Sequence, residues 1–261
     1  MVTVLGASGF IGSQIIKKLI FSNTPFYAPS REENIFNKDL GDIIYCIGLT
    51  ADFRTKPFET INAHICKLNE VLSKSSFNSL TYLSSTRVYI NSTKPVAYEE
   101  DKLLIDVMDS NDLYTLSKLT GERLCLSSGK KTKIIRLSNV IGKEDSNINF
   151  LSSIINTIKK EKTVLLQQSL SSSKDFVFID DVVDAILKII FTGKHQVYNV
   201  ASGQNTTNES ILIELQKYFT YTFSLIETPT INVFPTISIQ KICTEFIFKP
   251  KGFSEQLSLI I

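Results

Sequence analysis

Short apolar runs alternate along the chain with longer segments in which apolar residues recur every three or four positions. The first run, 2–5, ends at Gly6, and apolar residues then return at helical spacing from Phe10 to Ile20. Short runs are typical of buried strands, and the wider spacing is typical of helices with one apolar face. The alternation predicts strands at 2–5, 26–28, 43–47, 80–83 and 134–137, with helices at 10–20, 58–72 and 113–126. Such an order predicts a doubly wound parallel sheet with right-handed crossovers.

The pattern is looser after Gly142. It predicts a helix at 150–158, a strand at 176–178, a helix at 180–191, a strand at 197–200 and a helix at 211–219. Thr206 and Glu209 have capping-box spacing before the last of these helices. No Gly/Ser-rich or Pro-rich linker separates the two halves. We therefore expect a single structural unit, with a sheet domain at 1–142 and a lobe at 143–261 that is interleaved with the end of the sheet.

Composition narrows the class of protein. The 261 residues are 43% hydrophobic and 21% charged, with a formal net charge of +2, which is typical of a globular protein. A short basic cluster at 130–133 is interpreted as a solvated turn rather than a nucleic-acid contact. With no basic leader and no apolar run of membrane-spanning length, we expect a cytoplasmic protein without a membrane partner. Four separated cysteines and two histidines predict reduced thiols and no metal site.

A glycine turn follows the first predicted strand. Gly6 permits a tight turn, Gly9 lets a pyrophosphate approach the backbone, and Gly12 lets the helix pack closely on the strand. The N–H groups and positive dipole end of the helix would then favour an anionic diphosphate. This context predicts a dinucleotide site whose contacts are Gly6, Ser8, Gly9, Phe10, Ile11 and Gly12. The alternative is a glycine turn that binds no ligand.

The segment after the predicted strand at 26–28 bears on the choice of cofactor. A fold that prefers NAD usually carries an acidic residue about 20 residues beyond the glycine turn, where it binds the ribose hydroxyls. This chain has Ser30 and Arg31 there instead. Arg pairs with phosphate through two parallel hydrogen bonds, so the sequence favours NADP over NAD as the cofactor. In the alternative, Arg31 pairs with Glu32 or Glu33 in a solvated loop.

Two further motifs carry acid–base chemistry. Tyr114 and Lys118 are four residues apart, hence on one face of a predicted helix. A nearby positive charge favours the phenolate and lowers the pKa of the tyrosine toward the range of a general acid/base. Ser85 follows the strand at 80–83, and open α/β sheets bind ligands at the carboxyl ends of their strands. The sequence predicts that Ser85 hydrogen-bonds a reacting carbonyl or alcohol while Tyr114 moves its proton.

The glycine turn, Ser85, Tyr114 and Lys118, in this order, resemble the extended short-chain dehydrogenases/reductases, which include sugar-nucleotide epimerases, dehydratases and 4-keto reductases. The resemblance covers nearly the whole chain and implies a Rossmann-like fold with a small C-terminal substrate lobe. It implies Ser85 as substrate-orienting hydroxyl, Tyr114 as acid/base, and Lys118 as ribose binder and tyrosine activator. It also implies that Asn62 contacts the cofactor, and that the substrate is bound by Thr86, Asn139 and Lys174.

Two departures from the family pattern limit what the resemblance implies. Only about a dozen residues separate Arg31 from the strand at 43–47, which points to a sheet one strand short after the second strand. Where the dehydratases carry an Asp-Glu pair after the catalytic hydroxyl, this chain has Thr86 and Arg87, which disfavours dehydration. We interpret His64, beside the apolar face of its helix, as a surface or partly packed residue.

Three functions remain open at this point. The first is an NADP-dependent oxidoreductase that reduces a keto-sugar, expected in nucleotide-linked form, with Tyr114 as the acid/base. The second is an NAD-dependent sugar-nucleotide 4-epimerase, and the third is a non-catalytic NADP-binding regulatory protein. The resemblance also implies a homodimer formed through the helices that hold Asn62 and Tyr114, and a role in nucleotide-sugar metabolism such as polysaccharide biosynthesis.

Overall fold

A six-stranded parallel sheet forms the centre of the protein. The computed structural model describes residues 1–50, 53–109, 112–143 and 150–261. Across the sheet the strand order is β10-β6-β4-β3-β1-β2. The strands are β1 (Val2–Leu5), β2 (Phe26–Tyr27), β3 (Asp42–Tyr45), β4 (Ser79–Ser85), β6 (Thr132–Leu137) and β10 (Val197–Val200). The order reverses between β1 and β3, and the crevice outside the carboxyl ends of such strands is where open α/β sheets bind nucleotides.

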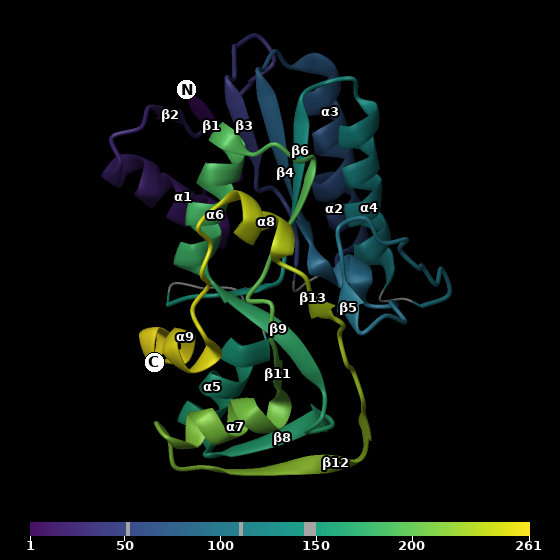
Figure 1. Ribbon diagram of the computed structural model, residues 1–261, viewed down its shortest axis with the longest axis vertical. Coiled ribbons are helices and arrows are strands. Elements are labelled where there is room, and N and C mark those ends of the chain that lie inside the picture. Colours follow the sequence, from purple (N-terminus) through teal and green to yellow (C-terminus); the bar gives the residue numbers. More distant parts are fainter. Residues whose placement is uncertain (51–52, 110–111, 144–149) are drawn as a thin grey trace.

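Helices cover both faces of this sheet (Figure 1). One face carries α1 (Phe10–Phe21) and α6 (Ile179–Thr192), which contact each other. The other face carries α4 (Asp112–Ser127) and a long helix made of α2 (Pro57–Ile61), the π-helical turn η1 (Asn62–Cys66) and α3 (Lys67–Lys74). Because the sheet is covered on both sides, its central strands are buried along nearly their whole length instead of alternating between buried and exposed residues. All four residues of β1 are buried accordingly.

The main sheet ends at β2, as the prediction of a sheet one strand short implies. This edge strand has only two residues, both half-buried. Residues 28–41 form turns and loops, with one isolated bridge between Asp39 and Ser76. The segment between Arg31 and β3 is too short for a further helix and strand. The chain returns directly to β3 instead.

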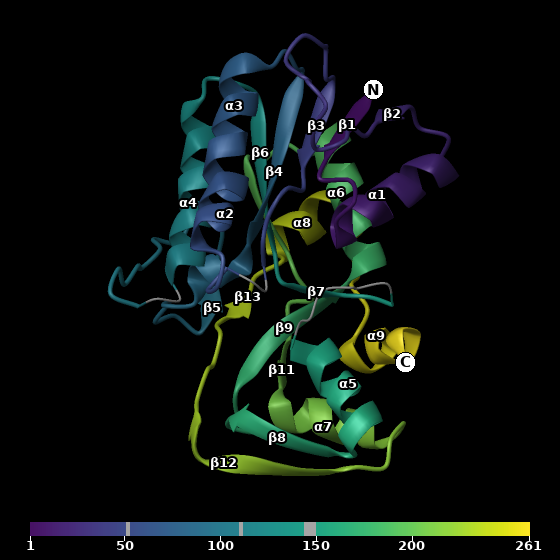
Figure 2. The same cartoon turned by 180° about the vertical axis from the view of Figure 1, so that it is seen from behind.

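A smaller lobe lies beyond one end of the main sheet (Figure 2). It holds a three-stranded sheet, β11-β9-β7, and a two-stranded sheet, β12-β8. Its elements are β7 (Asn139–Ile141), α5 (Phe150–Glu161), β8 (Thr163–Gln168), β9 (Ser173–Phe178), β11 (Asn205–Thr207), α7 (Asn208–Gln216), β12 (Thr222–Thr230) and α9 (Phe253–Ile260). The lobe has its own apolar core, which includes Ile158, Leu166 and Leu215. The chain enters it more than once, because β10 lies in the main sheet while β9 and β11 lie in the lobe.

Short segments join the lobe to the main sheet. β4 leads into the 3-10 helix η2 (Thr86–Tyr89), and β5 (Val96–Ala97) then pairs with β13 (Thr236–Ile237), which precedes α8 (Gln240–Glu245). The hydroxyl of Tyr89 donates a hydrogen bond to Oδ1 of Asn199 on β10 at 2.9 Å. This contact fixes the end of η2 against the main sheet. Since η2 begins directly after Ser85, it also restrains the segment next to that residue.

The predicted α/β class and every predicted helix and strand are confirmed, with ends that differ by a few residues. The capping prediction is wrong by one position: Thr207, not Thr206, accepts a hydrogen bond from the Ser210 N–H at 3.1 Å, because α7 begins at Asn208 and Thr207 directly precedes it. The strands β5, β7, β8, β11, β12 and β13 and the helices α8 and α9 were not predicted. In the part of the chain that the structure describes, no helix combines the length and apolar character needed to cross a bilayer.

Candidate active site

The glycine turn has the geometry that its sequence predicts. Gly6 has a φ of +85°, and a Cβ there would lie 2.9 Å from the backbone of Cys46. A Cβ at Gly12 would lie 2.3 Å from the carbonyl oxygen of Gly6, so α1 can lie this close to the turn only with glycine. At Gly9, by contrast, a Cβ would meet only the Gly6 oxygen, at 3.4 Å. The fold itself does not require glycine at Gly9, which leaves the approach of a ligand as the reason for it.

The first turn of α1 is suited to an anion. Its N-cap is Gly9, none of the described side chains caps it, and its first turn has no acidic residue. Ser8 and Gly9 are exposed, and Phe10 and Ile11 are half-buried. The first N–H groups of the helix therefore lack a side-chain acceptor, and the helix dipole adds positive potential. These residues fit the diphosphate of a dinucleotide at the point where the strand order reverses.

Ser30 and Arg31 lie just beyond the carboxyl end of β2, and both are exposed. Glu33 binds Lys38 at 2.5 Å and accepts a hydrogen bond from the Tyr27 hydroxyl at 2.5 Å. Arg31 forms no ion pair with any residue that the structure describes. Glu33 is therefore not paired with Arg31, and the guanidinium of Arg31 is available to a ligand.

Ser85, Tyr114 and Lys118 lie together at the carboxyl end of β4. Tyr114 and Lys118 share one face of α4 and are 5% and 6% exposed. Nζ of Lys118 lies 5.9 Å from the centre of the Tyr114 ring and donates to the carbonyl oxygen of Leu83 at 3.0 Å. The Tyr114 hydroxyl is hydrogen-bonded to the side chains of Ser85 and Thr50. The structure thus brings the three predicted residues together and adds Thr50, from the loop after β3.

Burial dominates the ionisation of both groups on α4. It raises the pKa of Tyr114, while the hydrogen bond with Ser85 and the positive charge of Arg87 oppose that rise. Burial also lowers the pKa of Lys118 to about 8. The Tyr114 pKa therefore lies above its usual value, not below it as predicted, because desolvation of the phenol outweighs the favourable interactions. Arg87 is one cation that opposes this rise.

His64 is a site neighbour that the sequence did not reveal. It is fully buried, so its interpretation as a surface or partly packed residue is wrong. Its Nε2 accepts a hydrogen bond from the Leu49 N–H at 3.2 Å, and its Nδ1 lies 2.8 Å from Oγ of Ser117. Because Ser117 donates its own proton to the Tyr114 carbonyl at 2.8 Å, Nδ1 must be the protonated nitrogen. The ring also packs edge-on against Tyr114, with 5.4 Å between centroids.

This histidine stays neutral. Burial and the nearby charge of Lys118 lower the pKa of His64 to about 2. A Cβ at Gly48 would lie 3.1 Å from Nε2 of His64, so any larger residue at this position would crowd the imidazole ring. His64 therefore ties the loop after β3 to the helix that carries Tyr114 and Lys118, without adding a second positive charge.

The remaining predicted residues surround this cluster less closely. Thr86 is buried directly after Ser85. Asn139 is exposed and donates through Nδ2 to the carbonyl oxygen of Asp175 at 2.7 Å. Lys174 is half-buried, with Nζ 4.2 Å from the centre of the Phe150 ring. Asn62 is exposed on η1 and has no side-chain hydrogen bond to the described residues, so its contact with a cofactor stays a prediction.

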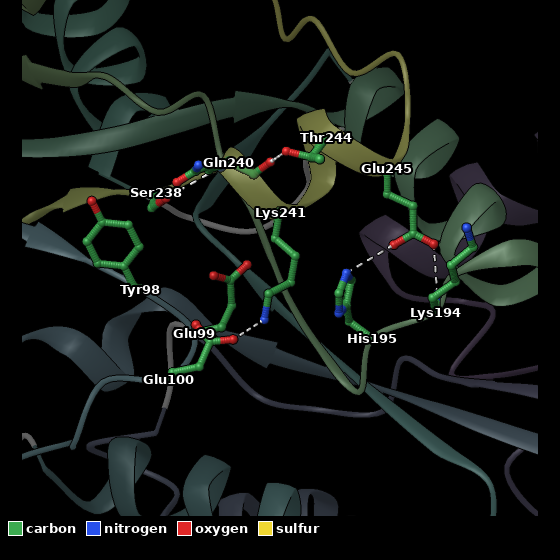
Figure 3. A pocket seen from close by; sticks show the side chains of 10 residues that line it. All are labelled: Tyr98, Glu99, Glu100, Lys194, His195, Ser238, Gln240, Lys241, Thr244 and Glu245. Atoms are coloured by element: carbon green, nitrogen blue, oxygen red, sulfur yellow. Dashed lines mark hydrogen bonds and ion pairs between the residues drawn. The ribbon is translucent and has the colours of Figure 1, made fainter.

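A separate cavity of about 420 Å³ opens beside β10 and α8 (Figure 3). Its lining includes Glu100, Lys241, His195 and Glu245, and none of the predicted site residues. Lys241 pairs with Glu100, and His195 lies 3.7 Å from Glu245. Lys241 and Glu100 neutralise each other, and we do not assign the chemistry to this cavity.

Comparison with known proteins agrees with this geometry. The profile of the NAD dependent epimerase/dehydratase family matches residues 43–201. The dTDP-4-dehydro-6-deoxyglucose reductase of Escherichia coli is 24% identical over 162 residues, which cover 59% of this chain and 49% of the relative, about half its length. The dTDP-4-dehydro-6-deoxy-D-allose reductase of a Streptomyces species is 22% identical over 251 residues, or 79% of this chain and 77% of the relative.

Solved structures share the fold. MoeE5 in complex with UDP-glucose and NAD aligns with a TM-score of 0.84 at 18% identity, over 99% of this chain and 96% of MoeE5. RMD from Pseudomonas aeruginosa, complexed with NADPH, aligns with a TM-score of 0.80 at 20% identity, over 99% of this chain and 97% of RMD. Since the family profile covers more than half of the sequence, this chain belongs to the NAD dependent epimerase/dehydratase family.

Proposed function

We propose that this protein reduces a nucleotide-linked keto-sugar, with hydride from NADPH and a proton from Tyr114. The observation that carries the proposal is the cluster of Ser85, Tyr114 and Lys118 at the sheet edge where the glycine turn fits a diphosphate. By their names, both curated relatives reduce nucleotide-linked keto-sugars, which supports reduction as the chemistry.

The side chains of the cluster divide the work of such a reduction. Oγ of Ser85 donates a hydrogen bond to the ketone oxygen and orients it. A bound dinucleotide supplies hydride to the ketone carbon. Tyr114 gives its proton to the oxygen, and its raised pKa keeps the phenol protonated until negative charge develops there. Lys118 binds the ribose, and its positive charge stabilises the phenolate that remains.

The residues after Ser85 argue against dehydration. Expelling water from a sugar requires an acid and a base beside the reacting carbon. This chain has Thr86 and Arg87 directly after Ser85, and neither side chain can serve as a carboxylic acid or a carboxylate. Besides hydride transfer with the dinucleotide, reduction and 4-epimerisation need only the proton transfer that Tyr114 offers.

A turnover assay with a panel of nucleotide-linked 4-keto sugars tests the proposal. We expect the purified protein to take up NADPH and oxidise it when the correct ketone is present. Protein that purifies with retained NAD and interconverts two epimers, with no net oxidation, would be a 4-epimerase instead. Protein that binds NADPH but turns over no member of the panel would favour the regulatory function.

The cofactor preference depends on Arg31. We expect Arg31→Ala to lower NADPH affinity roughly ten- to a hundredfold and to leave NADH affinity unchanged, because one charged hydrogen-bonding group is lost. Fluorescence titration with both dinucleotides measures the ratio. Arg123→Ala, which removes an exposed guanidinium from α4, is the matched control. An unchanged ratio in Arg31→Ala would mean that another group reads the phosphate.

Two further parts of the proposal concern assembly and location. We propose a homodimer formed through α2 and α4, since Phe58 on α2 is 85% exposed. A single-chain mass in analytical ultracentrifugation would contradict it. We also propose a cytoplasmic location, because Cys46, Cys66, Cys125 and Cys243 are all free thiols, as in a reducing compartment. Fractionation of the native cells tests this.

A further inference from the structure

Positive charge gathers beside the proton donor. Arg87 follows Ser85 by two residues, and the backbone N–H of Arg87 donates to Oγ of Ser85 at 3.2 Å. Its guanidinium carbon lies 5.6 Å from the centre of the Phe53 ring. The same ring lies 5.2 Å from the ring of Tyr114 and 4.5 Å from the guanidinium carbon of Arg54. Two guanidinium groups and the phenol of Tyr114 therefore contact one aromatic side chain.

A third cation reaches this region from the smaller lobe. Ser85 pairs with Leu137 between β4 and β6, and Asn139, two residues later, binds the carbonyl oxygen of Asp175 at 2.7 Å. Lys174, next to Asp175, thus lies near the carboxyl end of β4. Burial lowers the pKa of Lys174 to about 8, and the charge of Arg87 acts in the same direction.

Arg87 and Lys174 are poorly compensated. Nε of Arg87 is buried without a hydrogen-bond partner. Among the residues that the structure describes, neither Arg87 nor Lys174 forms an ion pair. The buried carboxylate of Asp112 already accepts hydrogen bonds from Asn91 and from the Asp106 N–H, both at 2.8 Å. Like charges held together in a partly buried site are costly unless an anion joins them.

We propose that Arg87, with Lys174 nearby, binds a carboxylate on the sugar ring, so that the substrate is the keto form of a nucleotide-linked uronic acid. The inference rests on the proposed function, because it takes the sugar to lie against Ser85 and Tyr114. Arg87 is on the same turn as Ser85, so the anionic group that it binds lies near the reacting carbon rather than on the nucleotide. The planar guanidinium matches a carboxylate through two parallel hydrogen bonds.

Calorimetric titration of the NADP-loaded protein tests this with two matched pairs of probes. One pair is UDP-glucuronic acid and UDP-glucose, the other GDP-mannuronic acid and GDP-mannose, with UDP and GDP alone as references. In at least one pair the uronic acid should bind roughly tenfold or more tightly than the hexose. Arg87→Met should lower the affinity for that uronic acid roughly ten- to a hundredfold and leave the hexose within about twofold.

The controls separate the possible causes of a loss. Arg123→Met removes an exposed guanidinium and should change none of the affinities. Arg87→Lys keeps the charge but loses the paired hydrogen bonds, and should fall between wild type and Arg87→Met. Unchanged NADP affinity and circular dichroism of Arg87→Met would show that the variant folds.

Three outcomes would overturn the inference. Equal affinity of the unmodified protein for uronic acid and hexose would do so while leaving the proposed function intact. An equal loss for UDP or GDP alone in Arg87→Met would assign Arg87 to the nucleotide phosphates instead. If no sugar nucleotide bound to the unmodified protein at all, the proposed function would fail, and this inference with it.

Discussion

Tyr114→Phe is expected to lower turnover roughly 10²–10⁴-fold, the usual contribution of a positioned general acid. The substitution removes only the hydroxyl, which is hydrogen-bonded to Ser85 and Thr50, and keeps the ring packed against Phe53 and His64. The fold and the affinity for NADP should therefore stay nearly intact. Steady-state kinetics on the identified substrate measure the loss. Full activity in this variant would remove the proton donor from the mechanism.

Lys118→Met distinguishes the two roles on α4. It should weaken cofactor binding, because Lys118 is the expected ribose ligand. It should also move the Tyr114-dependent limb of the pH–rate profile upward, because loss of a nearby positive charge disfavours the phenolate and raises the pKa of the phenol. A profile that keeps its position while NADP affinity falls would assign Lys118 to binding alone and leave Arg87 as the cation that acts on Tyr114.

Glu122→Ala is expected to lower the free energy of unfolding by about 3–5 kcal/mol, because it leaves a buried guanidinium without its partner. Arg136 donates to the two carboxylate oxygens of Glu122 at 3.0 and 2.7 Å, and both side chains are buried. Ser84 donates to the same carboxylate at 2.6 Å, so the pair also holds the end of β4 that carries Ser85. Urea denaturation, read as a change in midpoint at constant slope, measures the loss.

An exposed ion pair serves as the control for that measurement. Lys18 and Asp184 lie 2.7 Å apart with side chains 43% and 48% exposed, so Asp184→Ala should cost less than about 1 kcal/mol. Replacing Glu122 and Arg136 together, by leucine and methionine, should recover much of the stability, because no unpaired charge remains. Equal losses in Asp184→Ala and Glu122→Ala would contradict the importance of the buried pair.

The sequence alone determined the main sheet and its glycine turn, because their signals are local. Val2–Leu5 is mostly apolar and buried throughout, as expected for a strand covered on both faces, and Gly6 ends it. The turn and the apolar face of α1 lie within the next twenty residues or so, and need no distant partner to be recognised. In the same way, the spacing of Tyr114 and Lys118 places both on one face of a helix wherever that helix packs.

Several strands outside the main sheet could not be predicted, because they exist only through partners far along the chain. β8 and β12 pair with each other, yet most residues of β12 are exposed and give no apolar period. β5 and β13 have two residues each, too few for any pattern, and form only where the chain returns beside η2. Such pairings depend on tertiary contacts more than on the intrinsic preference of either strand.

Only the tertiary structure decided the surroundings of Tyr114. The π-helical turn Asn62–Cys66 departs from the regular helical spacing by which His64 was judged a surface or partly packed residue, and it buries this side chain against Tyr114. Arg87 lies far from Tyr114 in sequence and acts on the phenol only because α4 begins at the edge of the sheet where β4 ends. Spacing predicts which side chains share a face, whereas the pKa of Tyr114 depends on how completely the folded chain excludes water from it, and no local pattern carries that information.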